Sequence, residues 1–514
     1  MSGRDFFARL LISAVREIAE EIGRPQRERR EDFAAAARKR EEELRQRREE
    51  RVKSPEYKRR QEQDATRRET QRAWRAEAEE RKSSKRMAEE VLREALVDDC
   101  YSFDRLKAHY LVPAIALVRP YPPHREPSGR SHVGGCPDLP AGTAWPRTPT
   151  GEALHFLGQI DLAEAPACAA REALPAAGTM LFFVRIDQPL HIDEPGAIRV
   201  LFDPASSGCR TEPPDDLPAV DGKWMRNFAA TGELGPHTLP SWPWQLVAID
   251  TMPDAKAFQL LDIRGRVLDG YREAHRKFRA EEIRKATGQS RPAEGEREDL
   301  GLFRPKARGE PHALLPFAET GFPWVARGVE LAVRSVLRHC RQEPFAAFEG
   351  ELRSLWTRAE AHGPAEPVDA TEGEALADIL NRMLAVDVRI ATRPDGQEVA
   401  IHETRINNAI ATAAYRLITE AGGDPVLAAR LPNSLYASAR SRHFTSCPSQ
   451  MLGYLPSSQD PLQLGASTLT LLQLQSDWGI DLVIGDMGEF DFRLEPDALA
   501  RHDWDSVVVS YAGG

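Results

Sequence analysis

The stretch SHVGGCPDLPAGTAWPRTPTGEALHFLGQID, residues 131–161, decides how we expect this chain to fold, because it joins a glycine–proline corner to an apolar strand. Gly134 and Gly135 permit positive φ angles, and the prolines that follow stiffen the corner. Side chains alternate along a strand, which puts Gln159 and Asp161 on one face. The corner could hold a ligand, or it could be a rigid start for a sheet. The second interpretation is favoured, because buried polar side chains most often bond to backbone groups.

A second copy of this pattern lies near the end of the chain. The segment LHFLGQID (154–161) aligns with TLLQLQSD (470–477), and GTMLFF (178–183) aligns with GDMGEF (485–490). Chance similarity of apolar strands is the alternative, but a repeated supersecondary unit predicts two related sheets that meet across a shared seam. A polar cleft between the halves would then be lined by matched pairs and their neighbours. The ligand-binding candidates are Trp145, Gln159 with Gln475, Asp161 with Asp477, and Asp486.

The order of the patterns along the chain predicts an α+β fold, with two related β-rich halves that bracket a helical section. A long charged helical arm precedes them. We expect the arm at 1–97, the first β-rich half at 98–215, a mixed insert at 216–441 that is mainly helical after 320, and the second β-rich half at 442–514.

The arm differs from the body in charge. Residues 1–96 hold 27 Lys and Arg against 22 Asp and Glu, whereas the remainder holds 42 against 57. Residues 4–23 have the apolar spacing of an amphipathic helix. Two solvated helices are expected at about 26–53 and 56–97, separated at Ser54-Pro55 and supported by Glu-to-Arg pairs at four-residue spacing. No sustained heptad seam is present.

The pattern of the arm favours a protein partner or self-association. Its RERR, RQRR and YKRR stretches could meet phosphates, but the interleaved glutamates would repel the same phosphates, so nucleic-acid binding is the less favoured alternative.

The cysteine usage and the hydropathy indicate a cytoplasmic protein. Six cysteines are spread over 514 residues without a CxxC pair, which is typical of a reducing compartment. No apolar run reaches the ~18 residues that a bilayer requires, so no transmembrane segment is expected.

Signatures of the common enzyme classes are missing. The sequence contains no GxSxG, HExxH, GxxxxGK[ST] or helix-opening GxGxxG motif, and no cofactor is expected. Triads assembled from distant residues remain compatible with this pattern.

Two groups of residues in the sequence contain side chains that can bind a metal ion. His132-x3-Cys136 recurs as His443-x3-Cys447, and four such side chains could close a tetrahedral zinc site if the halves face each other. The spacing conflicts with the register of the repeat, so coincidence is favoured. The acidic residues between 477 and 491 could supply oxygens to Ca²⁺ or Mg²⁺, but roles in turns and at strand edges are favoured for them.

Several motifs at the two ends of the body carry a family resemblance. They are GGCPDLPAGTAWP, LHFLGQIDL, MLGYLPSSQD, LLQLQSDWGIDL and GDMGEFDF. Together they resemble the YwqG-like family of uncharacterised bacterial proteins over about 98–514. Two features depart from that pattern, namely an additional Leu455 before the proline and Gln475 in place of the usual aspartate. The resemblance implies a mixed α+β fold with β-rich halves and implies no activity.

The sequence thus predicts a cytoplasmic binding or interaction protein, whose arm serves assembly and whose inter-half cleft holds a ligand of unknown identity. A hydrolase that uses Asp and His residues in that cleft is the alternative. Nucleic-acid association through the arm is the second alternative.

Overall fold

The computed structural model describes most of the chain after residue 102. The described residues are 103–124, 129–186, 192, 194, 196–220, 225–232, 235–254, 265–289, 325–392, 398–443, 448–455, 468–485 and 487–512. The chain divides into two compact units, 1–84 and 85–514, and every described residue belongs to the second. The predictions for the arm lie outside the described residues.

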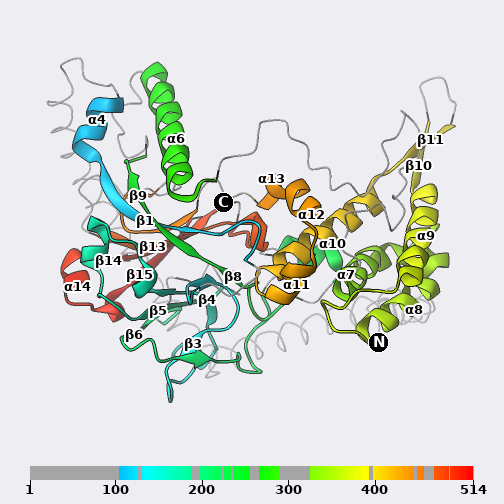
Figure 1. Cartoon of the computed structure of the whole chain (residues 1–514), viewed down its shortest axis with the longest axis horizontal. Helices are drawn as coiled ribbons and strands as arrows, with labels where there is room; N and C mark the ends of the chain where they lie inside the picture. Colours follow the sequence, from blue (N-terminus) through cyan, green and yellow to red (C-terminus); the bar gives the residue numbers. More distant parts are fainter. Residues whose placement is uncertain are drawn as a thin grey trace, which may run out of the picture. The chain divides into compact units, whose positions relative to one another are not determined.

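One large antiparallel sheet is built from both ends of the body (Figure 1). Its order is β15-β14-β13-β12-β1-β9. The strands are β1 (Val112–Val118), β9 (Gln245–Thr251), β12 (Ser449–Met451), β13 (Leu469–Gln475), β14 (Glu489–Leu494) and β15 (Val508–Ala512).

A second antiparallel sheet has the order β6-β5-β4-β2-β8. Its strands are β2 (His132–Val133), β4 (His155–Asp161), β5 (Thr179–Val184), β6 (Ile198–Asp203) and β8 (Trp242–Pro243), and a small pair, β3 (Asp138–Leu139) with β7 (Cys209–Arg210), lies beside them. Only Trp244 separates β8 from β9, so the chain crosses from one sheet to the other at that residue.

The two sheets repeat the same local geometry. β4 pairs with β5 through a bulge at Leu157, and β13 pairs with β14 through a bulge at Leu471. The hydroxyl of Ser131 accepts a hydrogen bond from the Asp161 amide at 2.9 Å, and the hydroxyl of Ser449 accepts one from the Gln475 amide at 3.1 Å. The glycine corner also recurs, with φ of 60° and 72° at 134–135 and of 60° and 66° at 452–453.

These shared contacts correct the register of the repeat that was expected from the sequence. The bulges and the serine contacts make Gln473 the counterpart of Gln159, whereas the sequence alignment matched Gln475. The shift is two residues and has a physical reason: an aspartate caps a short 3₁₀ turn after both strands, but in the second copy this Asp477 comes two residues later. Matching the letters Gln and Asp therefore aligned the caps and misaligned the strands.

The seam between the sheets is an apolar core. Phe182 of β5 and Phe492 of β14 are fully buried and meet edge to face at 5.2 Å between ring centroids. They occupy equivalent positions of the two copies, so their contact marks a pseudo-twofold axis. Fully burying such a side chain is worth ~1.5–3 kcal/mol. The expected polar cleft is absent at this seam in the described part of the body, because Gln159 and Gln475 lie on the faces turned away from it.

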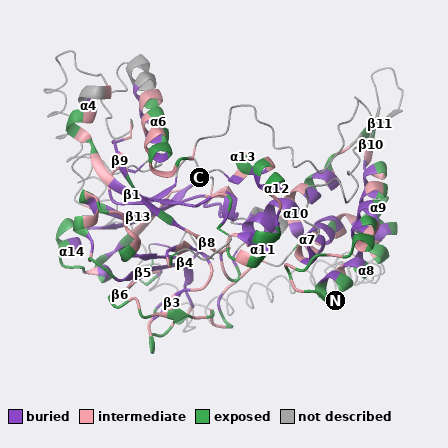
Figure 2. Cartoon of the chain, viewed as in Figure 1, coloured by how far each residue is buried: buried purple, intermediate pink, exposed green. Residues whose placement is uncertain are grey.

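A helical section follows the first sheet and includes a projecting hairpin. It contains α5 (Arg226–Thr231), α7 (Ala326–Leu337), α8 (Glu349–Glu360), α9 (Ala370–Val386), hairpin strands β10 (Val388–Thr392) and β11 (Glu398–His402), α10 (Arg405–Ala421), α11 (Pro425–Arg430), α12 (Asn433–Ser438) and α13 (Arg440–His443). Helix α10 is buried along most of its length and contacts α5 and α7 (Figure 2). Its apolar residues recur at helical spacing over two faces, which explains why it lies at the centre of this section.

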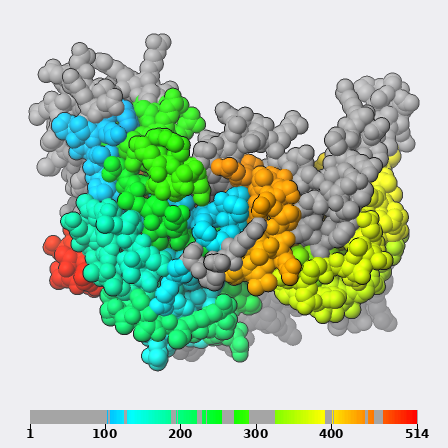
Figure 3. Space-filling view, in the orientation of Figure 1, coloured from blue at the N-terminus to red at the C-terminus, as the bar shows by residue number. Residues whose placement is uncertain are grey.

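Helix α6 (Gly265–Thr287) packs on the outer face of the six-stranded sheet over β1 and β9, where Ile283 belongs to one apolar cluster with Ala116 and Val247. Its opposite side forms part of the molecular surface (Figure 3). The remaining helices are α4 (Phe103–Tyr110) and α14 (Pro496–Ala500). The predicted α+β fold is confirmed. None of the helices among the described residues is both long and apolar enough to cross a bilayer.

Candidate functional site

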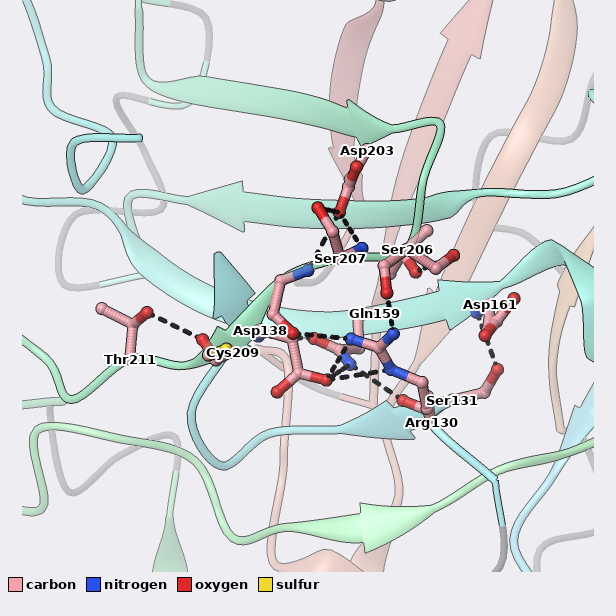
Figure 4. A network of polar contacts seen from close by, with 12 residues as sticks. Arg130, Ser131, Asp138, Gln159, Asp161, Asp203, Ser206, Ser207, Cys209 and Thr211 are labelled. Atoms are coloured by element: carbon pink, nitrogen blue, oxygen red, sulfur yellow. Dashed lines mark hydrogen bonds and ion pairs between the residues drawn. The ribbon is translucent and has the colours of Figure 1, made fainter. Parts of the chain in front are cut away.

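The glycine–proline corner of the first half is held by a polar network around Arg130 (Figure 4). The Arg130 guanidinium donates to Asp138 at 2.9 Å, to the Gly208 carbonyl at 3.0 Å and to the Ser206 carbonyl. Asp203 accepts bonds from the amides of Ser207 and Gly208 at 2.7 and 3.1 Å. The network fixes three loops to one another.

Gln159 lies at the centre of this network and is fully buried. Its Oε1 accepts from the Asp138 amide at 2.8 Å, while its Nε2 donates to the Arg130 carbonyl and to Asp138 Oδ2, both at 2.9 Å (Figure 4). Both ends of the carboxamide are therefore occupied by the corner. The interpretation of this stretch as a rigid corner accounts for every one of these contacts.

The other two candidates in the first half, Asp161 and Trp145, also bond to or pack on groups of the protein itself. Asp161 caps a turn by accepting from the Ala163 amide at 2.9 Å. Trp145 donates its indole N–H to the Leu154 carbonyl at 2.8 Å and packs edge to face on Phe183, with the ring centroids 5.7 Å apart. The structure does not place these two side chains with Gln475 or Asp477 in one site.

Asp477 joins the second half to the helical section. Arg119 contacts both of its carboxylate oxygens, at 2.9 and 3.1 Å, and Asp477 accepts the Gly479 amide at 2.8 Å. The guanidinium lies over the Trp242 ring at 4.4 Å and also donates to the His443 carbonyl. A β-carbon on Gly479 would lie 1.8 Å from Arg119 Nη2, so any side chain there would displace the guanidinium from Asp477.

His443 lies in the same junction. Its ring stacks on Tyr121 at 5.3 Å and lies near Trp242 and Tyr415. Burial, reinforced by the charges of Arg119 and Arg442, holds the pKa of His443 well below its usual range. The ring is therefore neutral near pH 7, as expected of a histidine that packs in a core.

Three of the four candidate zinc ligands, His132, Cys136 and His443, lie within the described residues, and they do not converge on one site there. His132 donates from Nδ1 to the Gly134 carbonyl at 2.8 Å, and burial lowers the pKa of the His132 ring. Burial raises the pKa of Cys136, whose thiol lies 3.4 Å from Glu212. Cys447 and the ligand candidate Asp486 lie outside the described residues. Within the described ranges, no three His, Cys, Asp or Glu side chains converge as metal ligands would.

A different set of polar side chains lies on the outer face of the six-stranded sheet. Thr470, Gln473 and Gln475 of β13 point to this face, and we call them the polar strip. Their exposed fractions are only 1%, 0% and 8%. Four of their atoms find no hydrogen-bond partner within the described part of the chain: Thr470 Oγ1, Gln473 Oε1, Gln473 Nε2 and Gln475 Nε2.

The neighbouring strands place charged and polar groups on both sides of the strip. On one side, Gln450 of β12 accepts from Arg279 of α6 at 3.2 Å. On the other side, Asp491 of β14 accepts from Arg493 at 2.9 Å. Glu489, which is 1% exposed, lies across from Gln475.

The first half provides an internal comparison for the strip. The position of Gln473 is taken there by Gln159, whose carboxamide is saturated. Other outer-face positions differ in kind: the counterparts of Thr470, Asp491 and Arg493 are Phe156, Leu181 and Phe183, which form a small apolar cluster.

The difference between the halves has an energetic meaning. A buried polar group without a partner costs ~1–3 kcal/mol. The second half thus has buried polar groups without a partner in the described residues. At the equivalent positions, the first half has either a hydrogen-bonded polar side chain or an apolar one. Such groups are the expected lining of a binding site, so the strip is the candidate functional site.

Only part of this site was foreseen from the sequence. The sequence predicts Gln475 as a ligand-binding candidate, but it does not point to Gln473 or Thr470. The available signal was the alternation LLQLQ at 471–475, which puts two glutamines on one face of an otherwise apolar strand.

A protein-family model matches the chain over two segments. The family described as "Domain of unknown function (DUF1963)" matches residues 131–282 and 372–512, more than half of the chain. The match supports the resemblance to an uncharacterised family with two related halves, and the narrower YwqG-like assignment remains a prediction. The segment between the matched ranges includes α7 and α8. No curated protein matches the chain.

Proposed function

Since the chain belongs to the DUF1963 family, which is described only as a domain of unknown function, we propose its function from the geometry: the body is a binding protein that holds a small polar ligand against the polar strip. The proposed ligand site therefore lies on the outer face of the six-stranded sheet and not at the seam between the halves, where the sequence predicts a cleft.

The observation that carries the proposal is the contrast between Gln473 and Gln159. Both are fully buried glutamines at the same position of a repeated unit. The Gln159 carboxamide is hydrogen-bonded to its own corner, whereas neither end of the Gln473 carboxamide has a hydrogen-bond partner within the described residues. A ligand that pairs with Gln473 would remove the cost of burying it.

The hydrolase alternative gains less support. Within the described residues, His132 is hydrogen-bonded to a backbone carbonyl and His443 is enclosed by aromatic rings and arginines. In that part of the chain, neither ring forms the hydrogen bond to a carboxylate or hydroxyl that a catalytic histidine needs. The location in the cytoplasm and the assembly of the protein through its arm, with a protein partner or a second copy, remain proposals from the sequence.

Small molecules retained by the natively purified full-length protein test the binding function. Denaturing extraction followed by mass spectrometry should release a compound in molar proportion to the wild-type protein and to the Gln245→Met control, which changes an exposed glutamine of the same sheet. Gln473→Met should release less than a tenth of that amount. Equal amounts from Gln473→Met and wild type would contradict a site at the strip.

A further inference from the structure

The charged side chains beside the polar strip already have partners before any ligand binds. Arg493 donates to Asp491, and Arg279 donates to Gln450, so the cations beside the strip already have acceptors. Phosphate binding relies on charge-assisted bonds from basic groups, and a hard cation requires several oxygen ligands. On the strip itself, the atoms without a partner in the described residues belong to neutral groups: the Thr470 hydroxyl, both ends of the Gln473 carboxamide and the Nε2 of Gln475.

The unpaired atoms have the hydrogen-bonding pattern of an amide. Gln473 presents a donor and an acceptor side by side, which is the complement of another amide group. Stacking on aromatic side chains is the usual way to hold a nucleobase, and the side chains opposite the strip are Gln450, Asp491, Glu489 and Arg493. An amide fits these neighbours better than a base does.

The spacing along β13 adds a second feature. Residues on one face of a strand recur about every 6.6 Å, twice the rise of ~3.3 Å per residue. Gln473 and Gln475 follow this spacing, and Thr470 extends the strip beyond the bulge at Leu471. An extended peptide repeats its own amides at the same interval, so successive peptide groups can meet successive glutamines.

We propose that the ligand of the polar strip is a short, neutral peptide segment in extended form, whose backbone amides pair with Gln473 and Gln475. This inference rests on the proposed binding function and names the ligand class of the same site. Because the strip is buried, the bound peptide is largely enclosed, and its entry requires local opening of the protein around β13.

Calorimetric titration of the full-length protein with N-acetyl-trialanine amide tests the proposal, with maltose and inorganic phosphate as the other probes. The peptide should bind the wild type and Gln245→Met alike, with the same affinity at low and high salt because the ligand is neutral. Gln473→Met should weaken binding at least tenfold. Thr470→Val, which keeps the shape of the side chain, should weaken it severalfold and serves if Gln473→Met folds poorly.

Two results would overturn the inference in different ways. Maltose or phosphate binding that is lost in Gln473→Met, with no response to the peptide, would refute the peptide class and leave the binding site standing. No binding of any probe, together with a crystal structure in which one ordered water satisfies Gln473, would refute both the inference and the binding function.

Discussion

The two equivalent glutamines allow a paired test of the structure, in which the same substitution is made in each half. Gln159→Met and Gln473→Met both replace a fully buried carboxamide by an unbranched apolar side chain of similar length. The chemistry and burial of the two changes match, so the difference in their effects reports the surroundings alone.

The structure predicts opposite signs. Gln159→Met removes three hydrogen bonds, at 2.8, 2.9 and 2.9 Å, and leaves the Asp138 amide and the Arg130 carbonyl without this partner. At ~1 kcal/mol for each bond, with more for the one to a carboxylate and for groups left unsatisfied, the loss is ~3–5 kcal/mol. Gln473→Met removes a carboxamide that has no partner in the described part of the chain, and in ligand-free protein it should be neutral or stabilising by ~1–2 kcal/mol.

The assay is urea unfolding of ligand-free protein after extensive dialysis, followed by tryptophan fluorescence. The midpoint of Gln159→Met should fall well below that of the wild type, and the midpoint of Gln473→Met should equal or exceed it. A loss of similar size in both variants would refute the reasoning, because it would mean that Gln473 is already paired within the protein.

Three further predictions concern the junction and the seam. Arg119→Met should destabilise the protein by up to ~3 kcal/mol by leaving the partly buried Asp477, whose side chain is 15% exposed, without its cation, and the double variant with Asp477→Asn should recover part of this loss in a double-mutant cycle of unfolding free energies. Phe182→Ala should cost ~3–5 kcal/mol of unfolding free energy, and a loss below ~1 kcal/mol would contradict its contact with Phe492 as the centre of the seam. The lowered pKa of His443 means that the unfolded chain binds a proton that the folded chain refuses, so stability should fall as pH drops below the unfolded value of 6.5; His443→Phe should flatten this part of the profile, and an unchanged profile would show that the ring is not buried neutral.

The sequence was sufficient for the corner and for the duplication, because both are encoded locally. Gly134 and Gly135 indicate a corner through local sequence alone, and the alternation around Gln159 predicts a strand with a polar face. The favoured interpretation of Gln159 as a support for the corner agrees with its contacts.

The register and the junction could not be predicted in the same way. A bulge at Leu471 leaves no distinct mark in an apolar run, so nothing in the letters showed that Gln473 is the counterpart of Gln159. Arg119 and Asp477 lie 358 residues apart in sequence, and only the folded chain brings them to 2.9 Å. Gln159 has hydrogen-bond partners in its own corner, whereas Gln473 has none within the described residues. This difference arises from how the two halves pack, and the composition of the sequence does not reveal it.

The crystal structure of the natively purified full-length protein, at a resolution that distinguishes water from larger ligands, tests the central claim most directly. We predict elongated density on the outer face of the six-stranded sheet, within hydrogen-bond distance of Gln473 Oε1 and Nε2 and larger than any water. A side chain of the protein itself bonded to both ends of that carboxamide would contradict the claim that the second half has freed this glutamine for a ligand.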